Sequence, residues 1–175
     1  MCDLAKKAQG RLRFIDASYI RVHHSGLNAK GGRAAQAIGL SRGGLTTKIH
    51  ALVDGQGRAL KLLLSAGNMA DIAMAPALVA GLSGSQCGTL VADKGYDSDA
   101  LRVLLVEKDI FPCLAINATR KENRSFHRGY YRKRHHVENF FAALERQRRV
   151  ATRYEKLATS FAAFVTLGAI LNWIS

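Results

Sequence analysis

Three acidic residues, Asp16, Asp93 and Glu138, stand where the hydrophobic pattern of the chain does not by itself require a carboxylate. Asp16 lies within the alternating segment 12–22, Asp93 directly follows a short apolar run, and Glu138 lies beside an apolar helical stripe. If folding gathers these carboxylates, they repel one another unless cations neutralise them, and oxygen ligands suit Mg²⁺ or Mn²⁺. Two such ions, roughly 3.5–4 Å apart, clamp the attacking and leaving oxygens of a phosphodiester displacement. The three acids therefore predict two-metal-ion chemistry on a phosphodiester.

Each acid also has an ordinary structural interpretation. Asp16 could face solvent from an edge strand, and Asp93 could pair with Lys94 or accept backbone N–H groups in the following turn. Glu138 could be a surface acid that pairs with Arg134, four residues earlier on a helix. Taken singly, these interpretations outweigh catalysis. The coincidence of three such acids in a basic chain favours chemistry.

The elements that position the acids begin with three strands. Residues 12–22 (LRFIDASYIRV) alternate in polarity and favour β-structure. A glycine-rich, basic loop is expected over 23–45. Two apolar runs, 46–54 and 59–67, follow it. Asp54 and the glycine after it predict an antiparallel hairpin between these runs, with Asp54 as a turn residue.

Helices and strands alternate in the rest of the chain. A helix is expected over about 71–82, with Pro76 in its first turn or with a later start of the helix. Segments 88–93 and 111–117 predict short buried strands on either side of a second helix. Asp97 or the serine after it is expected to cap that helix. A further amphipathic helix, which carries Glu138, has apolar residues at helical spacing: Val137, Phe140, Phe141 and Leu144.

This order of elements predicts the fold. A doubly wound dinucleotide fold would open with a βαβ unit and a glycine-rich turn, which this chain does not do. Three leading strands followed by alternating helices and strands favour a ribonuclease-H-like α/β domain, with a mixed sheet flanked by helices. We expect one domain over 1–175: a sheet core over 12–117, a basic insertion over 118–132, and C-terminal helices over 133–175. Neighbouring first and fourth strands would bring Asp16 and Asp93 together.

The composition indicates a polyanionic partner. The 175 residues include 26 Lys and Arg against 13 Asp and Glu, a formal net charge of +13. Such an excess is typical of nucleic-acid-binding proteins. Basic residues are dense over 120–156, with 12 Lys and Arg against four acids. Segment 157–175 carries no charge and is long enough to span a bilayer, but its polar residues favour a buried C-terminal helix and no membrane partner.

Three segments resemble bacterial insertion-sequence transposases of the DDE type: 41–54 (SRGGLTTKIHALVD), 92–102 (ADKGYDSDALR) and 135–158 (HHVENFF…RRVATRYEKLA). The similarity extends over nearly the whole chain, from about residue 14. In this family the first acid follows a strand-opening hydrophobic pair, which matches Asp16. The second lies in a DKGYD-like segment, which matches Asp93.

The third acid of the family belongs to a signature of tyrosine, two residues, arginine, three residues, glutamate, six residues and lysine. The first three positions are matched in type and spacing by Tyr131, Arg134 and Glu138. The last position is Glu145 instead of lysine, and the adjacent Arg146 points about 100° away around a helix. This departure affects one phosphate contact and leaves the proposed metal ligands intact.

The resemblance implies a transposase catalytic domain that cleaves DNA and transfers strands at the ends of an insertion sequence. Asp16, Asp93 and Glu138 would hold two Mg²⁺ or Mn²⁺ ions. DNA contacts are expected from residues near these acids: Lys94, Tyr131, Arg132, Lys133 and Arg134. Tyr131 has a structural alternative as a packing residue at the helix entry.

The expected partners are the DNA of the element ends and target, and other copies of the chain in a transposition complex. The first predicted strand begins within about a dozen residues of Met1, which leaves no room for a helix-turn-helix reader. We therefore expect the downstream product of a split or frameshifted element, acting with a DNA-reading segment encoded upstream, in the cytoplasm at the bacterial nucleoid. A metal-dependent nuclease without strand transfer, a non-catalytic DNA-binding remnant and a basic RNA-binding protein are the alternatives.

Overall fold

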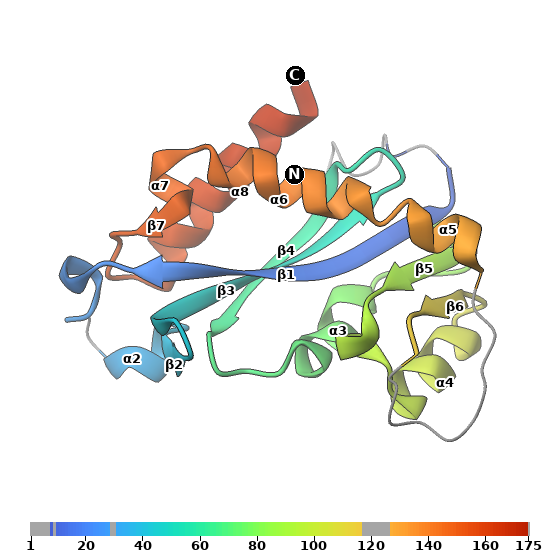
Figure 1. Ribbon diagram of the computed structural model, residues 1–175, viewed down its shortest axis with the longest axis horizontal. Helices are drawn as coiled ribbons and strands as arrows, with labels where there is room; N and C mark the ends of the chain where they lie inside the picture. The colour runs from blue at the N-terminus through green and yellow to red at the C-terminus, as the bar shows by residue number, and fades with distance from the viewer. Residues whose placement is uncertain (1–7, 9, 29–30, 117–126, 175) are drawn as a thin grey trace.

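The described part of the chain forms a seven-stranded mixed sheet with helices on both faces, as the order of elements predicted (Figure 1). The computed structural model describes residues 8, 10–28, 31–116 and 127–174. The strands lie in the order β2–β3–β1–β5–β6, with β4 paired to β3 and β7 paired to β1. Their bounds are β1 Leu12–Val22, β2 Gly39–Ser41, β3 Gly44–Asp54, β4 Ala59–Ala66, β5 Thr89–Ala92, β6 Phe111–Leu114 and β7 Thr152–Arg153.

Strand β1 organises the sheet. It pairs antiparallel with β3 from Arg13 to Arg21, parallel with β5 at its beginning and parallel with β7 at its end. Among the described residues, the pairing with β5 ends at Phe14 and the pairing with β7 begins at Arg21. Residues 15–20 therefore have a strand on one side only. This stretch, called the open edge of β1 below, interrupts the sheet between β5 and β7.

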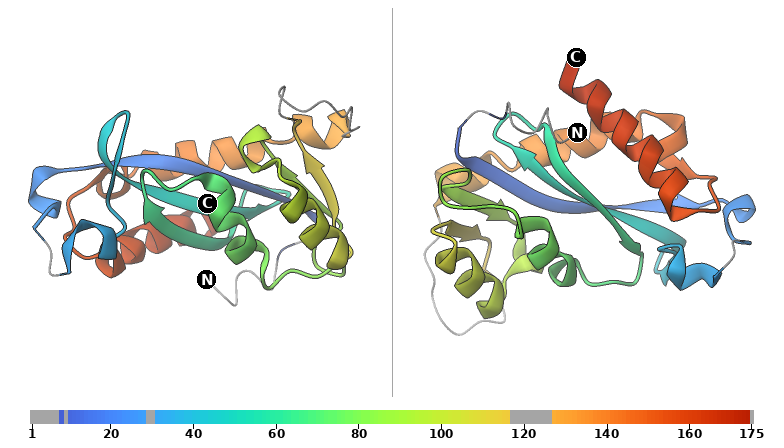
Figure 2. Two further views of the ribbon diagram at one scale, coloured as in Figure 1. Left: turned by 90° about the horizontal axis from the view of Figure 1, so that it is seen from below. Right: turned by 180° about the vertical axis from the view of Figure 1, so that it is seen from behind.

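Helices cover the two faces of the sheet separately (Figures 1 and 2). The face called the α6 face is covered by α6 (His135–Glu145) and α8 (Ala158–Ile174), and the α3 face by α3 (Asp71–Val79) and α4 (Asp99–Glu107). Because side chains alternate along a strand, Phe14 packs in the core under α6 and Ile15 in the core under α3. The shorter helical elements are η1 His24–Gly26, α2 Gly32–Ala35, η2 Lys94–Tyr96, α5 Arg128–Arg132 and α7 Arg148–Ala151.

The amphipathic helix predicted around Glu138 is α6, and all four residues of its apolar stripe are buried, as predicted: Val137, Phe140, Phe141 and Leu144. Burying an aliphatic or aromatic side chain of this size stabilises the fold by about 1.5–3 kcal/mol. The stripe therefore fixes the rotation of α6 about its own axis, and with it the direction in which the polar residues beside the stripe point.

The hairpin predicted between the two apolar runs is confirmed. β3 and β4 pair antiparallel, and Asp54 is the turn residue. Its Oδ1 accepts hydrogen bonds from the N–H groups of Gln56 (2.9 Å) and Arg58 (3.0 Å). The Arg58 guanidinium bonds Asp54 Oδ2 at 2.7 Å.

Part of the expected loop over 23–45 is a second hairpin, so that prediction was wrong there. β2 pairs antiparallel with β3, and the chain reverses through Arg42 and Gly43. Gly44 adopts a φ of +95°, which glycine reaches without strain. The strand β2 has three residues and little apolar character, so its polarity pattern did not distinguish it from a loop.

The predicted place of Pro76 was wrong, and of the two expected caps of α4 (Asp99–Glu107) the structure selects Ser98. Pro76 lies inside α3, beyond its first turn, because the helix begins at Asp71. A proline there removes one N–H donor from a short helix, and Pro76 is exposed. Asp97 does not cap α4. Its carboxylate is buried and pairs with Arg102 (2.8 Å), while Ser98 Oγ caps the helix by accepting from the N–H of Leu101.

The basic insertion expected over 118–132 falls partly outside the described residues, which omit 117–126. Its last part is helical instead of irregular, because Arg128–Arg132 form α5. His127 Nδ1 caps this helix by accepting from the N–H of Tyr130 at 3.2 Å. This local cap fixes the first turn of α5, a helix that the apolar pattern of the sequence did not predict.

The C-terminal helix α8 is only half buried, which corrects the expectation of a buried helix. One side packs against β4 and α6 through Phe161, Val165 and Ala169. The other side leaves large apolar side chains exposed: Leu167, Leu171 and Ile174. Among the described residues, we find no helix with the length and apolar character needed to cross a membrane.

One histidine lies in the sheet without contact to solvent. His50 of β3 is fully buried, and its Nε2 lies 2.7 Å from Ser65 Oγ of β4. Its Nδ1 has no hydrogen-bond partner among the described residues. The pKa of His50 is lowered to about 4: burial lowers it most, Asp71 opposes this, and nearby Lys48 lowers the pKa as well. The folded chain therefore holds this imidazole neutral.

We expect the stability of the chain to depend on pH through His50. Its pKa is lower in the folded than in the unfolded state, so the unfolded state binds the extra proton between about pH 4 and 6.5. The contribution of His50 to the free energy of unfolding should fall by up to about 3 kcal/mol as the pH drops through this window. Urea unfolding of wild type and His50→Gln at several pH values measures this contribution, which appears as a steeper dependence of the free energy of unfolding on pH in wild type. Exposed His24 supplies the control, since His24→Gln should keep the wild-type slope.

Candidate active site

The sheet brings Asp16 and Asp93 to the same place. In the parallel pairing of β1 and β5, Phe14 lies opposite Val91. Continuing this register by two residues places Asp16 beside Asp93, just beyond the end of β5. Phe14 and Val91 both belong to the core under α6, so by alternation Asp16 also points to the α6 face.

Arg134 joins the acids. Its Nη2 donates to Asp16 Oδ2 at 2.5 Å, and its Nη1 donates to Glu138 Oε1 at 2.7 Å. Asp16, then Glu138 and Asp93, raise the pKa of Arg134 against the opposing effect of its burial. One guanidinium thus lies among all three acids predicted from the sequence. The pairing of Arg134 with Glu138, four residues apart on the helix, was anticipated as the structural interpretation of Glu138, whereas its contact with Asp16 was not.

The carboxylate of Asp16 is held in an unfavourable environment. Only 16% of its side chain is exposed. Its pKa is raised to about 6: burial raises it most and Asp93 raises it as well, while Arg134 and the hydrogen bond from the N–H of Ala17 (2.9 Å) lower it. A functional site is a common reason for a carboxylate to remain where its charge is disfavoured.

Asp93 has both a structural contact and an exposed neighbourhood. Its Oδ1 accepts from the N–H of Gly95 at 2.9 Å and so caps η2. This confirms the turn interpretation of Asp93 and fixes the carboxylate directly after a buried strand. Lys94, the next residue, is exposed at the edge of the site, where a polyanion could reach it.

The oxygen donors of this site fit a cation. Among the described residues, no three Asp, Glu, His or Cys side chains lie close enough together to hold a metal ion as they stand. However, Asp16 and Glu138 already share one positive group, the Arg134 guanidinium, with Asp93 near it. Two aspartates and a glutamate are the donor set that hard divalent cations prefer. A metal ion would take over the neutralising role of Arg134.

Glu145 is a fourth acid on this side of α6, and the sequence showed it only as a missing lysine. Its Oε1 accepts from Ser18 Oγ at 2.6 Å, and Ser18 follows Asp16 on the same side of β1. Glu138 and Glu145 are seven residues apart, about two helical turns, and therefore share a face. This spacing was the available sign that Glu145 faces the sheet.

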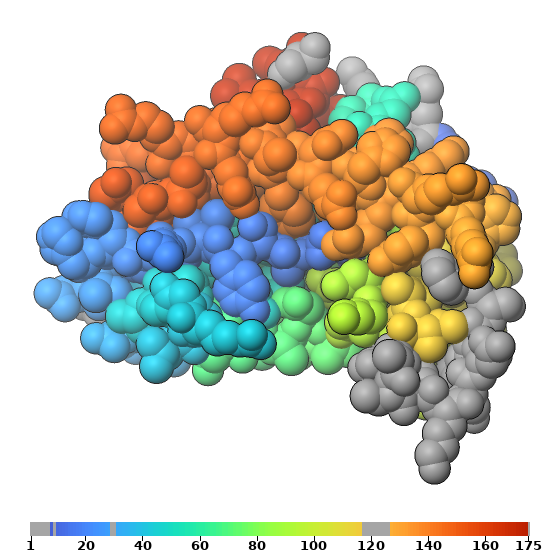
Figure 3. All heavy atoms as spheres, viewed as in Figure 1, coloured from blue at the N-terminus to red at the C-terminus, as the bar shows by residue number. Residues whose placement is uncertain are grey.

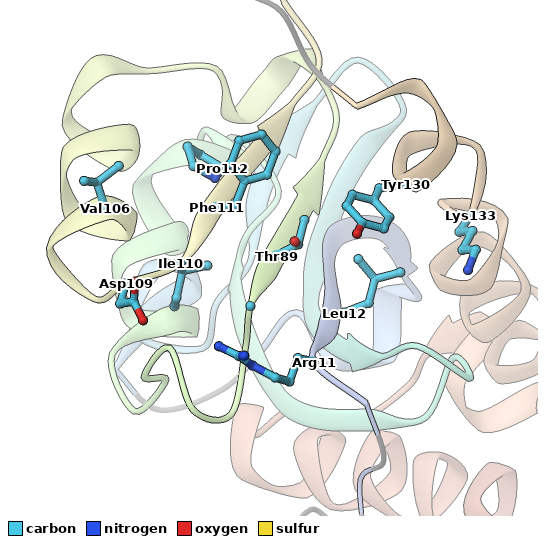
Figure 4. A pocket seen from close by; sticks show the side chains of 11 residues that line it. Arg11, Leu12, Thr89, Val106, Asp109, Ile110, Phe111, Pro112, Tyr130 and Lys133 are labelled. Carbon is cyan, nitrogen blue, oxygen red and sulfur yellow. The ribbon is translucent and has the colours of Figure 1, made fainter.

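The predicted DNA-contacting residues do not all lie at the acids. Arg132 and Lys133 are exposed, but Lys133 lines a hollow of about 670 Å³ at the opposite end of β5, together with Tyr130 and Thr89 (Figure 4). Tyr131 is partly buried against the core under α6, which supports its interpretation as a packing residue. Fewer basic residues thus contact the acids directly than the dense basic segment 120–156 suggested.

Comparisons with known proteins identify the family. Residues 7–173 match the Transposase DDE domain family. A Brucella ovis protein assigned as a transposase for insertion sequence element IS6501 is 36% identical over 131 residues, which are 74% of this chain and 99% of that protein.

The fold is also similar to that of a piggyBac transposase, solved by cryo-EM in a synaptic complex with hairpin DNA. The TM-score is 0.58 at 12% identity, over 94% of this chain and 46% of that chain, so this chain spans slightly less than half of its length. At this identity the likeness concerns the fold, and it confirms the ribonuclease-H-like sheet.

We expect Asp16→Asn to stabilise the chain at neutral pH. The pKa of Asp16 is raised on folding, so between about pH 4 and 6 the folded state binds more protons, and the contribution of Asp16 to stability falls as the pH rises. At pH 7.5 the variant should exceed wild type by up to about 3 kcal/mol in the free energy of unfolding, and below about pH 4 the two should converge.

Urea unfolding in EDTA measures this difference, with Glu107→Gln at an exposed acid as the control that should match wild type. A variant less stable than wild type at pH 7.5 would show that the ion pair with Arg134 outweighs the burial of the carboxylate.

Proposed function

The chain belongs to the DDE transposase family, and we therefore propose that it cleaves DNA strands at the ends of an insertion sequence and transfers them to a target, using Mg²⁺ or Mn²⁺. The observation that carries the proposal is that the Arg134 guanidinium bonds two of the predicted acids, Asp16 and Glu138, and is influenced electrostatically by the third, Asp93. Asp93 caps η2 and Glu138 pairs along its helix, but neither local role requires these acids to lie near a third carboxylate, Asp16, that is buried at the cost of a raised pKa.

In the proposed mechanism, Asp16, Asp93 and Glu138 hold two divalent cations. When bound, such ions polarise the phosphodiester and favour the deprotonated nucleophile, first water and then a freed 3′-hydroxyl. Asp16 and Asp93 are placed by the sheet, which makes them rigid ligands, whereas Glu138 is half exposed and can adjust. Arg134 must leave both carboxylates, and its guanidinium is then free to pair with a DNA phosphate.

Exposed basic residues next to the acids and along α5 support binding of a polyanion. Lys94 follows Asp93 directly, and Arg132 and Lys133 lie at the end of α5, ahead of α6. We propose that they contact the DNA backbone, which gives affinity without reading sequence. Recognition of the element ends would then come from a DNA-reading segment encoded upstream, and assembly from further copies of the chain.

A DNA-binding chain that does not cleave is the second candidate function. Glu145 is the observation that favours it, because a carboxylate stands two helical turns from Glu138 where the family signature has a cation. A fourth negative charge on this face would oppose the approach of a phosphate.

The first test is nicking of supercoiled plasmid with Mg²⁺ or Mn²⁺. Wild type should nick only with metal, and Asp93→Asn should lose at least about 100-fold in rate, since groups that merely orient a metal ligand already cost 10–100-fold when removed. Glu138→Gln should lose as much, and Glu107→Gln at an exposed acid should lose nothing.

Equal nicking by wild type and Asp93→Asn would contradict the carboxylate site. Salt-sensitive DNA binding without nicking by wild type would establish the second candidate instead. Joining of an oligonucleotide with a free 3′-hydroxyl to the plasmid separates a transposase from a simple nuclease.

Glu145→Lys tests the departure from the family signature. A lysine there places a cation beside Ser18 on the acid face, so we expect tighter binding of duplex DNA and a salt slope steeper by about 0.9, the value for one added phosphate contact. Glu107→Lys makes the same change of charge on an exposed position of α4 and should alter the slope less. Equal slopes in the two variants would show that position 145 does not face the DNA.

A further inference from the structure

A cleft of about 800 Å³ lies on the α3 face, beneath the open edge of β1. It is bounded by β1, by the turn between β2 and β3, and by the segment that leads into α3. In the view of Figure 3 these segments lie together on the front of the molecule, below the band formed by α5 and α6. Gly95 also lines the cleft, two residues after Asp93, so the cleft begins next to the candidate active site.

The open edge connects this cleft with the acids. Tyr19 and Arg21 line the cleft and by alternation leave β1 on the face opposite to Asp16. Tyr19 is three residues from Asp16, roughly 10 Å along the strand. Because residues 15–20 pair with a strand on one side only, a bound chain can cross this edge from one face of the sheet to the other.

Tyr19 presents an exposed and supported ring. It is 53% exposed, although it is a large aromatic residue in the middle of a central strand. The Lys48 ammonium lies over the ring, 4.5 Å from its centroid. Lys48 is itself buried and bonded to Asp71 Oδ1 and to the carbonyl of Met69, both at 2.6 Å. The ring is therefore held in place while its exposed part faces the cleft, as in a stacking platform.

The charge of the cleft suits an anion. Arg21 and Arg42 are exposed at its rim. Asp71 also lines the cleft, but its carboxylate is neutralised by Lys48. Because Lys48 already neutralises Asp71, the guanidinium groups of Arg21 and Arg42 give the rim a net positive charge. Guanidinium groups bind phosphate oxygens in a forked geometry.

We propose that this cleft binds an unpaired stretch of the DNA strand that passes through the active site, with Arg21 and Arg42 on its phosphates and Tyr19 stacked on a base. A cleft of about 800 Å³ has a mean dimension of roughly 9 Å, which is less than the width of the major groove of a DNA duplex, about 12 Å, so a duplex does not fit inside it. Aromatic rings combined with basic groups are the means by which proteins hold single strands without reading their sequence. The inference rests on the proposed function for the identity of the substrate.

The test is the affinity of the full chain for a short, fluorescently labelled single-stranded DNA, measured by anisotropy in EDTA. Tyr19→Ala and Arg42→Ala should each weaken binding about tenfold, and Tyr19→Phe, which keeps the ring, less than about twofold. Arg33 of α2 provides the matched control. It is an exposed arginine that does not line the cleft, and Arg33→Ala should weaken binding less than about threefold.

Equal affinities of Tyr19→Ala, Arg42→Ala and Arg33→Ala would overturn the proposal, as would equal losses for single-stranded and duplex DNA. If Tyr19→Ala fails to fold, as judged by circular dichroism, Arg42→Ala at an exposed residue decides alone. Plasmid nicking separates the two proposals. If nicking depends on Asp93 but the Tyr19→Ala and Arg42→Ala variants bind single-stranded DNA like wild type, only the proposal for the cleft is wrong. If these variants selectively lose single-strand binding but wild type does not nick the plasmid, only the proposed cleavage activity is wrong.

Discussion

Carboxylates brought together from separate elements need a cation beside them, and in this chain Arg134 provides it, bonded to Asp16 and Glu138 and within electrostatic range of Asp93. The contact requires α6 to lie over β1 with a fixed rotation, because Arg134 must reach Asp16 while remaining within one turn of Glu138. The buried stripe of α6 sets that rotation. Asp16 accepts the arrangement despite a pKa raised by burial, so its position costs stability that the packing of α6 on the sheet must offset. The hydrophobic core and the acid site are thus two consequences of one helix orientation.

The interruption of the sheet is the second constraint. A continuous strand beside β1 would hydrogen-bond its edge throughout and cover the approach to Asp16. Instead β5 ends at Ala92, and β7 pairs only with the last residues of β1. The end of β5 therefore does two things at once: it presents Asp93 after a rigid strand, and it leaves residues 15–20 accessible. This arrangement allows one strand of a bound polymer to contact the acids on one face and the Tyr19 cleft on the other.

The features that the sequence could predict are those set by interactions between residues close together in the chain. Alternation along β1 and helical spacing along α6 are local patterns, so the strand, the helix and the side chains beside their apolar faces followed from them. The neighbouring placement of β1 and β5 was only a condition of the sequence argument, and the sheet pairing fulfils it. Arg134 and Asp16 are 118 residues apart, and no local pattern reports their contact. The choice between Asp97 and Ser98 as the cap of α4 was open for the same reason, since Asp97 forms an ion pair with Arg102 that only the packed fold allows.

The charge distribution links the acids to the basic character of the chain. A phosphodiester that approaches Asp16, Asp93 and Glu138 is repelled unless positive groups outnumber the acids along its path. Here Lys94 lies at the end of β5 and Arg42 at the rim of the cleft beyond it, so cations continue along the approach to the acid cluster. Glu145 interrupts the pattern on α6 with a negative charge. If the substrate is DNA, the balance between that residue and the cations around it determines how closely a phosphate can approach the three carboxylates, and therefore whether the site binds DNA only or also cleaves it.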